Sequence, residues 1–123
     1  MIPDCIFCSP DRPILAETAL SLAFLDSFPV SAGHALIVPR RHVISIWEMT
    51  SDEYTDAFHL VRTVESVLQA KFHPHGFNVG VNCGESAGQS VWHAHIHVIP
   101  RYIGDVPNPK GGVRNIIPGK GNY

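Results

Sequence analysis

Alternating apolar and polar positions along the chain predict four strands in two neighbouring pairs. Apolar runs around residues 22–25 and 35–38 are separated by DSFPVSAG, whose proline and glycine mark a connection. Residues 77–82 (FNVGVN) alternate as a strand, and the alternation returns over residues 92–101 (WHAHIHVIPR) after a loop of small residues. We expect the second pair to form an antiparallel hairpin.

A long helix is predicted between the two pairs of strands. From residue 50 to residue 72, apolar side chains recur at steps of three and four, and Thr50 with Glu53 has the spacing of a capping box. Strands that carry one long helix on a face make an α+β fold. We expect one α+β domain over residues 1–123, with a glycine- and proline-rich tail over residues 105–123 that lacks secondary structure.

Composition limits the environments and partners to be considered. The 123 residues are 45% hydrophobic, enough to bury a core, and the formal charge of −2 gives no general bias toward nucleic acid or an anionic membrane. The sequence has neither the roughly 18 consecutive apolar residues of a membrane helix nor the layout of a secretion signal. We expect a cytoplasmic protein without nucleic-acid or membrane partners.

Three histidines alternate with apolar residues in the last predicted strand. Because successive side chains of a strand point to opposite faces, His93, His95 and His97 would line one face while the residues between them line the core. The pattern permits a metal site, acid–base or nucleophilic chemistry, or a merely polar face. Histidines four positions apart on a strand are about 13 Å apart, so all three are not expected to bind one zinc ion.

The loop before these histidines consists largely of small and polar residues. Glycines in GESAGQS allow backbone N–H groups to approach an oxyanion, and Gln89 and Ser90 can donate side-chain hydrogen bonds. This composition suits a phosphate-binding loop. A tight solvent-exposed loop between two strands is the alternative.

A Cys-x-x-Cys pair near the beginning of the sequence indicates a second type of site. Cys5 and Cys8 could provide half of a tetrahedral zinc site, which two histidines would complete. A redox dithiol and a pair of buried free thiols remain alternatives.

The run GQSVWHAHIHVIPR resembles the signature of the histidine triad superfamily of nucleotide hydrolases and transferases. The resemblance extends from about Cys5 to Asp105, and it includes LAFLDSFPVSAGHALIVPRRH, in which His34 occupies the place of a further histidine of the family. It implies an antiparallel sheet of about five strands with one helix packed on a face. It also implies a homodimer.

The resemblance implies a covalent mechanism centred on His95. His95 matches the nucleophile that attacks the α-phosphorus of a nucleotide, and its other ring nitrogen is expected to bond to the carbonyl of His93. Charge on the phosphate would be met by His97, Gln89 and the N–H of Ser90, in the manner of an oxyanion hole. A neutral imidazole is both nucleophilic and a fair leaving group, which makes this role chemically reasonable.

Further residues gain roles from the same resemblance. His34 matches a residue that supports the triad, Asp26 matches the position that binds the ribose hydroxyls, and Asn82 is expected among the nucleotide-binding residues. Several apolar residues are candidates for the base pocket, with ordinary core positions as the alternative: Phe7, Leu22, Phe24 and Ile37.

Members of the superfamily that carry the cysteine pair, including relatives of galactose-1-phosphate uridylyltransferase, imply the remaining metal ligands. These ligands match His42 and His93, so that His93 would hold a structural zinc ion while His95 performs the chemistry. A closed site with four protein ligands is not expected to activate water. No organic cofactor is expected.

The resemblance also ranks the activities. IPRYIGD and PVSAGHALIVP look more like the dinucleoside polyphosphate hydrolases of the fragile histidine triad branch than like the phosphoramidases. Hydrolysis of a dinucleoside polyphosphate such as diadenosine tetraphosphate is therefore the first expectation. Hydrolysis of a purine nucleoside phosphoramidate is the second, and a nucleotide-binding signalling module with incidental turnover is the third.

Overall fold

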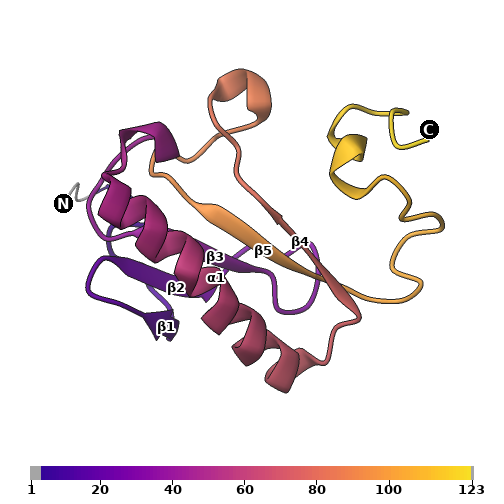
Figure 1. Cartoon of the computed structure of the whole chain (residues 1–123), viewed down its shortest axis with the longest axis horizontal. Helices are drawn as coiled ribbons and strands as arrows, with labels where there is room; N and C mark the ends of the chain where they lie inside the picture. Colours follow the sequence, from indigo (N-terminus) through magenta and orange to yellow (C-terminus); the bar gives the residue numbers. More distant parts are fainter. Residues whose placement is uncertain (1–3, 123) are drawn as a thin grey trace.

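One antiparallel sheet of five strands forms the centre of the computed structural model, which describes residues 4–122 (Figure 1). Neighbouring strands follow the order β1-β2-β3-β5-β4. Their bounds are Ile14–Glu17 (β1), Ser21–Leu25 (β2), Ala35–Pro39 (β3), Gly76–Gly80 (β4) and Ile96–Arg101 (β5). With one long helix on the sheet, this arrangement confirms the predicted α+β fold. Strand β1 was not found from the pattern, because it contains only four residues and none of them is buried.

The helix α1 (Ser51–Phe72) covers one face of the sheet (Figure 1). It begins as predicted: the Glu53 N–H donates to Thr50 Oγ1 at 3.1 Å, and the Thr50 N–H donates to the Glu53 carboxylate at 2.8 Å. Its buried apolar positions are spaced three and four residues apart and pack on alternate residues of the inner strands. This core consists of Ala57, Leu60, Val64 and Leu68 from the helix and Ala23, Ala35, Ile37, Ile96 and Val98 from the sheet.

A second apolar layer lies on the opposite face of the sheet. Its buried members are Phe7, Leu22, Phe24, Leu36 and Val38. The strand register places Phe24 opposite Leu36 and Leu36 opposite His97. His97 therefore continues a row of apolar side chains on the face that lacks the helix.

The histidine strand is shorter than predicted. Strand β5 begins at Ile96, so His93 and His95 precede it and only His97 lies within the strand. The partner strand β3 ends at Pro39, which has no N–H with which to extend the ladder. The backbone instead bonds to the following loop, where the Ala94 N–H donates to the Val43 carbonyl at 2.8 Å. The prediction that this segment has an apolar inner face holds for Ile96 and Val98.

The turn between β2 and β3 is fixed by a close approach to the helix. Gly33 has φ +88°, and a Cβ atom on it would lie 2.8 Å from the ring of Phe72 at the end of α1. A side chain at this position would therefore be strained and would collide with the helix. The turn places the next residue, His34, inside the protein with 3% of its surface exposed.

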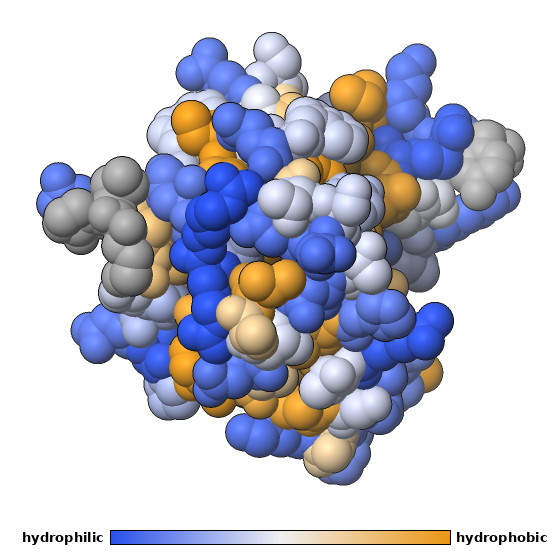
Figure 2. Space-filling model, turned by 60° about the vertical axis from the view of Figure 1, so that its left-hand side comes forward, coloured by the Kyte–Doolittle hydropathy of each residue, from blue (hydrophilic) through white to orange (hydrophobic). Residues whose placement is uncertain are grey.

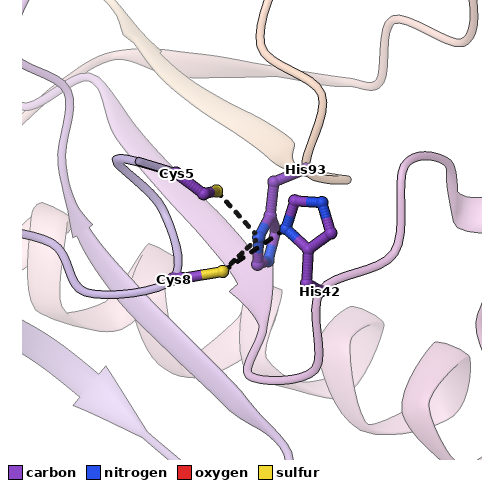
Figure 3. Close-up of side chains that lie close together, drawn as sticks. All are labelled: Cys5, Cys8, His42 and His93. Atoms are coloured by element: carbon purple, nitrogen blue, oxygen red, sulfur yellow. Dashed lines mark hydrogen bonds between the residues drawn. The ribbon is translucent and has the colours of Figure 1, made fainter. Parts of the chain in front are cut away.

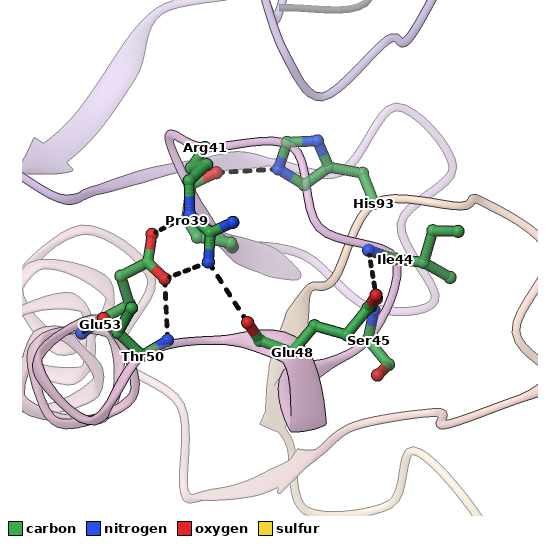
Figure 4. Close-up of polar contacts among 8 residues, drawn as sticks. All are labelled: Pro39, Arg41, Ile44, Ser45, Glu48, Thr50, Glu53 and His93. Atoms are coloured by element: carbon green, nitrogen blue, oxygen red, sulfur yellow. Dashed lines mark hydrogen bonds and ion pairs between the residues drawn. The ribbon is translucent and has the colours of Figure 1, made fainter.

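The loop between β3 and α1 is held by an ion pair and by a helix cap (Figure 4). The Arg41 guanidinium donates to both carboxylate oxygens of Glu53, at 2.8 and 3.0 Å. The Glu48 carboxylate accepts hydrogen bonds from the Ile44 and Ser45 N–H groups at 3.0 and 3.1 Å. These contacts attach the loop that carries His42 to the N-terminus of the helix.

The tail differs from the prediction. It contains a short 3₁₀ helix, η3 (Gly112–Ile116), which lies close to β4, one of the two edge strands of the sheet. The local pattern gave no sign of it, because the four glycines and three prolines of residues 105–123 are typical of irregular structure. On the face seen in Figure 2, apolar residues occur in small groups among polar ones. No helix within residues 4–122 is long and apolar enough to span a bilayer.

We predict that Glu53→Gln lowers the free energy of unfolding by about 1–3 kcal/mol, because it leaves the Arg41 guanidinium with a weaker, uncharged partner. Hydrogen bonding to Arg41 lowers the pKa of Glu53 to about 2. The wild-type advantage should therefore be complete above pH 4.5 and should decline as the pH falls toward 2. Urea unfolding at several pH values measures it. The matched variant is Glu65→Gln on the exposed side of α1, and equal losses for both variants would refute this account.

Candidate active site and metal centre

His95 is held by the backbone with one ring nitrogen left open. Its Nδ1–H donates to the carbonyl of His93 at 2.8 Å, the contact that the family resemblance implied. In the neutral ring this leaves Nε2 without a proton and with its lone pair available. Phe7 packs edge-on against the ring with centroids 5.0 Å apart, and only 7% of His95 is exposed. The imidazole is therefore oriented as a nucleophile requires.

A chain of hydrogen bonds fixes the tautomer of His97. The Val30 N–H donates to His34 Nδ1 at 3.1 Å, so this nitrogen is an acceptor and His34 carries its proton on Nε2. That Nε2–H donates to His97 Nδ1 at 2.9 Å. The proton of His97 must then be on its own Nε2. Since the rings of His95 and His97 lie 5.0 Å apart, His97 offers an N–H donor beside the His95 ring.

This chain of hydrogen bonds requires His34 and His97 to be neutral, and the surroundings of both rings favour the neutral state. Burial, with a smaller effect of the neighbouring His95, lowers the pKa of His97 to about 4. Burial also lowers the pKa of His34, against the opposing influence of Asp26. At neutral pH each ring therefore has one proton, as the direction of the hydrogen bonds demands.

Asp26 follows β2 and faces the same site. Its Oδ1 accepts the Phe28 N–H at 3.0 Å, while Oδ2 lies 3.5 Å from His34 Nε2. The side chain is 19% exposed and lines the hollow that contains His95. Its carboxylate keeps accepting capacity for a ligand, which is compatible with the expected contact to a ribose.

The hollow at His95 has a volume of about 330 Å³ and a largely apolar wall. Its lining residues include Ile6, Phe7, Phe28, Leu36, Val91 and Ser90. Of the four residues expected in a base pocket, Phe7 lines this hollow. Leu22 and Phe24 are in the layer behind it, and Ile37 is on the helix side of the sheet. Ile37 differs from the expectation because side chains alternate along a strand. Leu36, one position earlier, lines the hollow, so Ile37 faces the helix.

Gln89 organises the loop between β4 and β5. Its Oε1 accepts the Gly84 N–H at 3.0 Å, and its Nε2 donates to the carbonyls of Ile44 at 2.7 Å and Val91 at 3.1 Å. Only 4% of Gln89 is exposed. The expected contact with a phosphate would require one of these bonds to be released, whereas the neighbouring Ser90 already lines the hollow.

A second hollow of about 520 Å³ adjoins the first one. His97 and Asn82 line both hollows, and His34 contributes to the second. Its other walls come from β4 and from η3, including Val113 and Ile116. His97 thus lies where two ligand-sized hollows meet.

Four further side chains meet behind His95 (Figure 3). Cys5 and Cys8 come from the N-terminal segment, His42 from the loop after β3, and His93 from the segment before β5. The sulfur–nitrogen distances are 3.4 Å for Cys5–His93, 3.6 Å for Cys8–His93 and 3.3 Å for Cys8–His42. All four ligand atoms lie within 4.8 Å of one another.

These residues fit a tetrahedral zinc ion. Bond lengths of about 2.3 Å to sulfur and about 2.0 Å to nitrogen require ligand atoms roughly 3.5 Å apart, close to the distances found here. The Nε2–H of His93 donates to the Pro39 carbonyl at 2.7 Å, which directs the unprotonated Nδ1 toward the thiols (Figure 4). Burial lowers the pKa of His93 and so favours the neutral ring that a metal requires.

Asp26, His34 and His97 form another group whose ligand atoms lie within 4.8 Å. Their hydrogen bonds disfavour a metal. A metal on His34 Nε2 would leave the proton of the neutral ring on Nδ1, where it would face the Val30 N–H that now donates to this atom. The group is therefore better described as a hydrogen-bonded support of His97.

The sequence profile of the HIT domain, which is named for the histidine triad, matches residues 10–104. The chain belongs to the HIT domain family.

Relatives of known activity include two proteins of Schizosaccharomyces pombe. An adenosine 5'-monophosphoramidase is 41% identical over 114 residues, which cover 89% of this HIT chain and 79% of the relative. An asymmetrical bis(5'-nucleosyl)-tetraphosphatase is 39% identical over 92 residues, which cover 75% of this chain and 50% of the relative.

Solved structures agree with the fold. A HIT family protein of Bacillus anthracis has a TM-score of 0.78 at 36% identity, covering 85% of this chain and 78% of that one. A zinc-bound histidine triad family protein of Mycobacterium smegmatis has a TM-score of 0.75 at 30% identity, covering 83% and 78%.

Sequence reasoning overlooked some residues of the site. Val30 acts through its backbone N–H, which no side-chain pattern reveals. Ile6 lies between the two cysteines, and the local pattern does not show that it lines the hollow. Leu36 could have been found by following the alternation of β3.

We predict that the stability of this HIT domain declines as the pH falls from 7 toward 4. The folded-state pKa values of His34 and His97 lie below the ordinary value, so the unfolded chain binds more protons in this range. Each such histidine contributes a slope of up to about 1.4 kcal/mol per pH unit. Urea unfolding at several pH values should show a shallower dependence for His97→Asn than for the wild type.

The exposed His59 provides the matched control. His59→Asn should have the wild-type pH dependence, and the cysteine–histidine cluster is common to all three proteins, so their difference isolates His97. Identical slopes for wild type and His97→Asn would contradict the assignment.

Proposed function

We propose that this protein is a nucleotide hydrolase that works through a nucleotidyl group bound to His95. The observation that carries the proposal is the hydrogen bond from His95 Nδ1–H to the His93 carbonyl at 2.8 Å, which leaves Nε2 as a nucleophile in the hollow. The hydrolase names of its relatives support the same conclusion.

The reaction has two displacements at phosphorus. His95 Nε2 attacks the α-phosphorus, a nitrogen–phosphorus bond forms, and the bond from phosphorus to the leaving group breaks. Water then attacks the same phosphorus, its proton is released, and the nucleoside monophosphate departs with return of the electron pair to Nε2. The Nε2–H of His97 is positioned to hydrogen-bond to the phosphate oxygens, and the N–H of Ser90 can assist.

The two adjoining hollows favour a dinucleoside polyphosphate as the substrate. The first hollow, with Asp26 on its rim and Phe7 in its wall, suits the nucleoside that is transferred. The second hollow of about 520 Å³ lies on the other side of His97 and Asn82, where the leaving nucleotide would lie. A relative that is a bis(5'-nucleosyl)-tetraphosphatase supports this choice.

A purine nucleoside phosphoramidate is the second candidate. The relative with phosphoramidase activity has 41% identity and covers 89% of this chain, more than the tetraphosphatase does. The small amine leaving group of such a substrate would make no use of the second hollow. Comparing the rates on diadenosine tetraphosphate and adenosine phosphoramidate therefore distinguishes the two.

We predict that His95→Ala lowers turnover of diadenosine tetraphosphate by on the order of 10³-fold or more, because no other group can form the covalent intermediate. Nucleotide binding should persist, since the other residues of the wall, Phe7 and Asp26 among them, are unchanged. Rapid quenching of the wild-type reaction followed by mass mapping should place an added nucleotidyl group on His95.

His59→Ala, at the exposed histidine of α1, is the matched control and should retain wild-type turnover. An adduct mapped to another residue, or undiminished cleavage by His95→Ala, would exclude this mechanism. A module that only binds nucleotide would show neither adduct nor turnover.

We further propose that Cys5, Cys8, His42 and His93 hold one structural zinc ion, and that the protein forms a homodimer like other members of its superfamily. Support for zinc comes from the converging ligand atoms and from the zinc-bound relative. Bound zinc would join the N-terminal segment to the residues around the nucleophile. With four protein ligands it leaves no coordination position for water, so the chemistry stays with the histidines.

We predict that the purified protein contains one zinc ion per chain and that chelation lowers its melting temperature, because metal binding contributes to the stability of the fold. Cys8→Ser should lose most of the zinc. Cys83→Ser, at the partly buried cysteine outside the cluster, should keep it. Elemental analysis and thermal unfolding measure both effects, and retention of zinc by Cys8→Ser would refute the ligand assignment.

A further inference from the structure

We propose that metal binding at Cys5, Cys8, His42 and His93 sets the affinity for nucleotide, because the two thiols bracket Ile6 and Phe7, which form one wall of the nucleoside hollow. The inference rests on the proposed function in one respect: the hollow beside His95 must bind a nucleotide. It goes further by giving the metal centre a role in substrate binding as well as in stability.

The residues between the cysteines face the site. Ile6 and Phe7 both line the hollow that contains His95. Ile6 is 62% exposed, so its side chain is available to a ligand. Phe7 is 8% exposed, and its ring packs against Phe24 with centroids 5.6 Å apart as well as against His95 at 5.0 Å.

Within the described part of the chain, residues 5–8 make few hydrogen bonds to other segments. This segment precedes β1, which begins at Ile14, so the sheet provides no backbone ladder here. The Cys8 N–H donates to the Cys5 carbonyl at 3.2 Å and closes a tight turn. Within residues 4–122, the segment contacts the rest of the protein through the ring of Phe7, through Cys5 packed on the same apolar layer, and through the thiol–imidazole pairs. Thiols are weak hydrogen-bond partners, whereas metal–thiolate bonds are strong.

This difference connects the two sites energetically. Without metal, a nucleotide that packs against Ile6 must also order the segment, and the entropy lost in ordering reduces its affinity. With metal bound, the segment is already ordered. The coupling is reciprocal: if metal raises nucleotide affinity by a given factor, nucleotide must raise metal affinity by the same factor. We expect a factor of about 5–100, the usual range for coupled sites.

Two titrations of the wild-type protein test the coupling. Calorimetry with AMP as the probe compares zinc-loaded and metal-free protein, while circular dichroism monitors the fold. Competition with a chelator then measures zinc affinity with and without saturating AMP. Both experiments should give the same factor. Equal AMP affinity in the two forms, or a zinc affinity that AMP does not change, would overturn the inference.

A variant of Ile6 tests the structural basis and needs no metal-free protein. Ile6→Ala, kept fully zinc-loaded, should bind AMP about five- to tenfold more weakly, because part of the apolar wall is lost. Its zinc affinity without AMP should equal that of the wild type, and the effect of AMP on zinc affinity should shrink. The matched control is Ile103→Ala, which removes an 82% exposed isoleucine outside the hollow. It should change none of these values.

The outcomes separate this inference from the proposed function. If His95-dependent hydrolysis is observed while metal and Ile6→Ala leave AMP affinity unchanged, only the coupling is wrong. If AMP binds with the predicted coupling and no adduct forms on His95, the coupling stands and the catalytic proposal fails. Should metal-free protein unfold, the zinc-loaded Ile6→Ala protein decides, and unchanged AMP binding by it would refute the inference.

Discussion

The buried residue His93 makes the contacts on which both sites depend. Its carbonyl holds Nδ1–H of His95, its Nε2–H is held by the Pro39 carbonyl, and its Nδ1 faces the two thiols. None of its surface is exposed. A buried polar group without partners is costly, so each of these contacts constrains the others. One residue thereby fixes the ring orientation of His95, the proposed nucleophile, and contributes its Nδ1 to the candidate metal site.

The sheet separates structural and chemical functions between its faces. On one face, α1 packs on alternate residues of the inner strands and excludes water from Ile37, Ile96 and Val98. On the other face, the row from Phe24 through Leu36 reaches His97, and the N-terminal segment closes over part of it. Because strand side chains alternate, the same short sequence provides the helix-covered core and the histidines of the site.

The direction of the hydrogen bonds gives His95 and His97 different chemical properties, although both side chains are imidazoles. The chain from the Val30 N–H through His34 determines which nitrogen of His97 carries the proton. The carbonyl of His93 holds the proton of His95 on Nδ1, so that Nε2 of His95 presents a lone pair. Two neighbouring imidazoles thus have complementary properties: His95 presents a lone pair and His97 presents an N–H. Burial keeps His97 neutral and preserves this difference at neutral pH.

The residue pattern was enough to predict the α1 helix with its Thr50–Glu53 cap and four of the five strands, because periodicity and capping are local properties that neighbouring residues specify. The family followed from the motif around the three histidines. Through the family resemblance the sequence also led to Cys5, Cys8, His42 and His93, which the structure brings together as a candidate metal site. Three features became visible only in the folded protein: β5 starts at Ile96, Gln89 bonds to backbone carbonyls, and Ile6 lies in the wall of the hollow. These features depend on contacts between distant segments, such as Cys8 and His93, which are 85 positions apart. A local pattern does not show which distant backbone groups will lack a hydrogen-bond partner in the fold. Those groups determine where a side chain such as Gln89 binds.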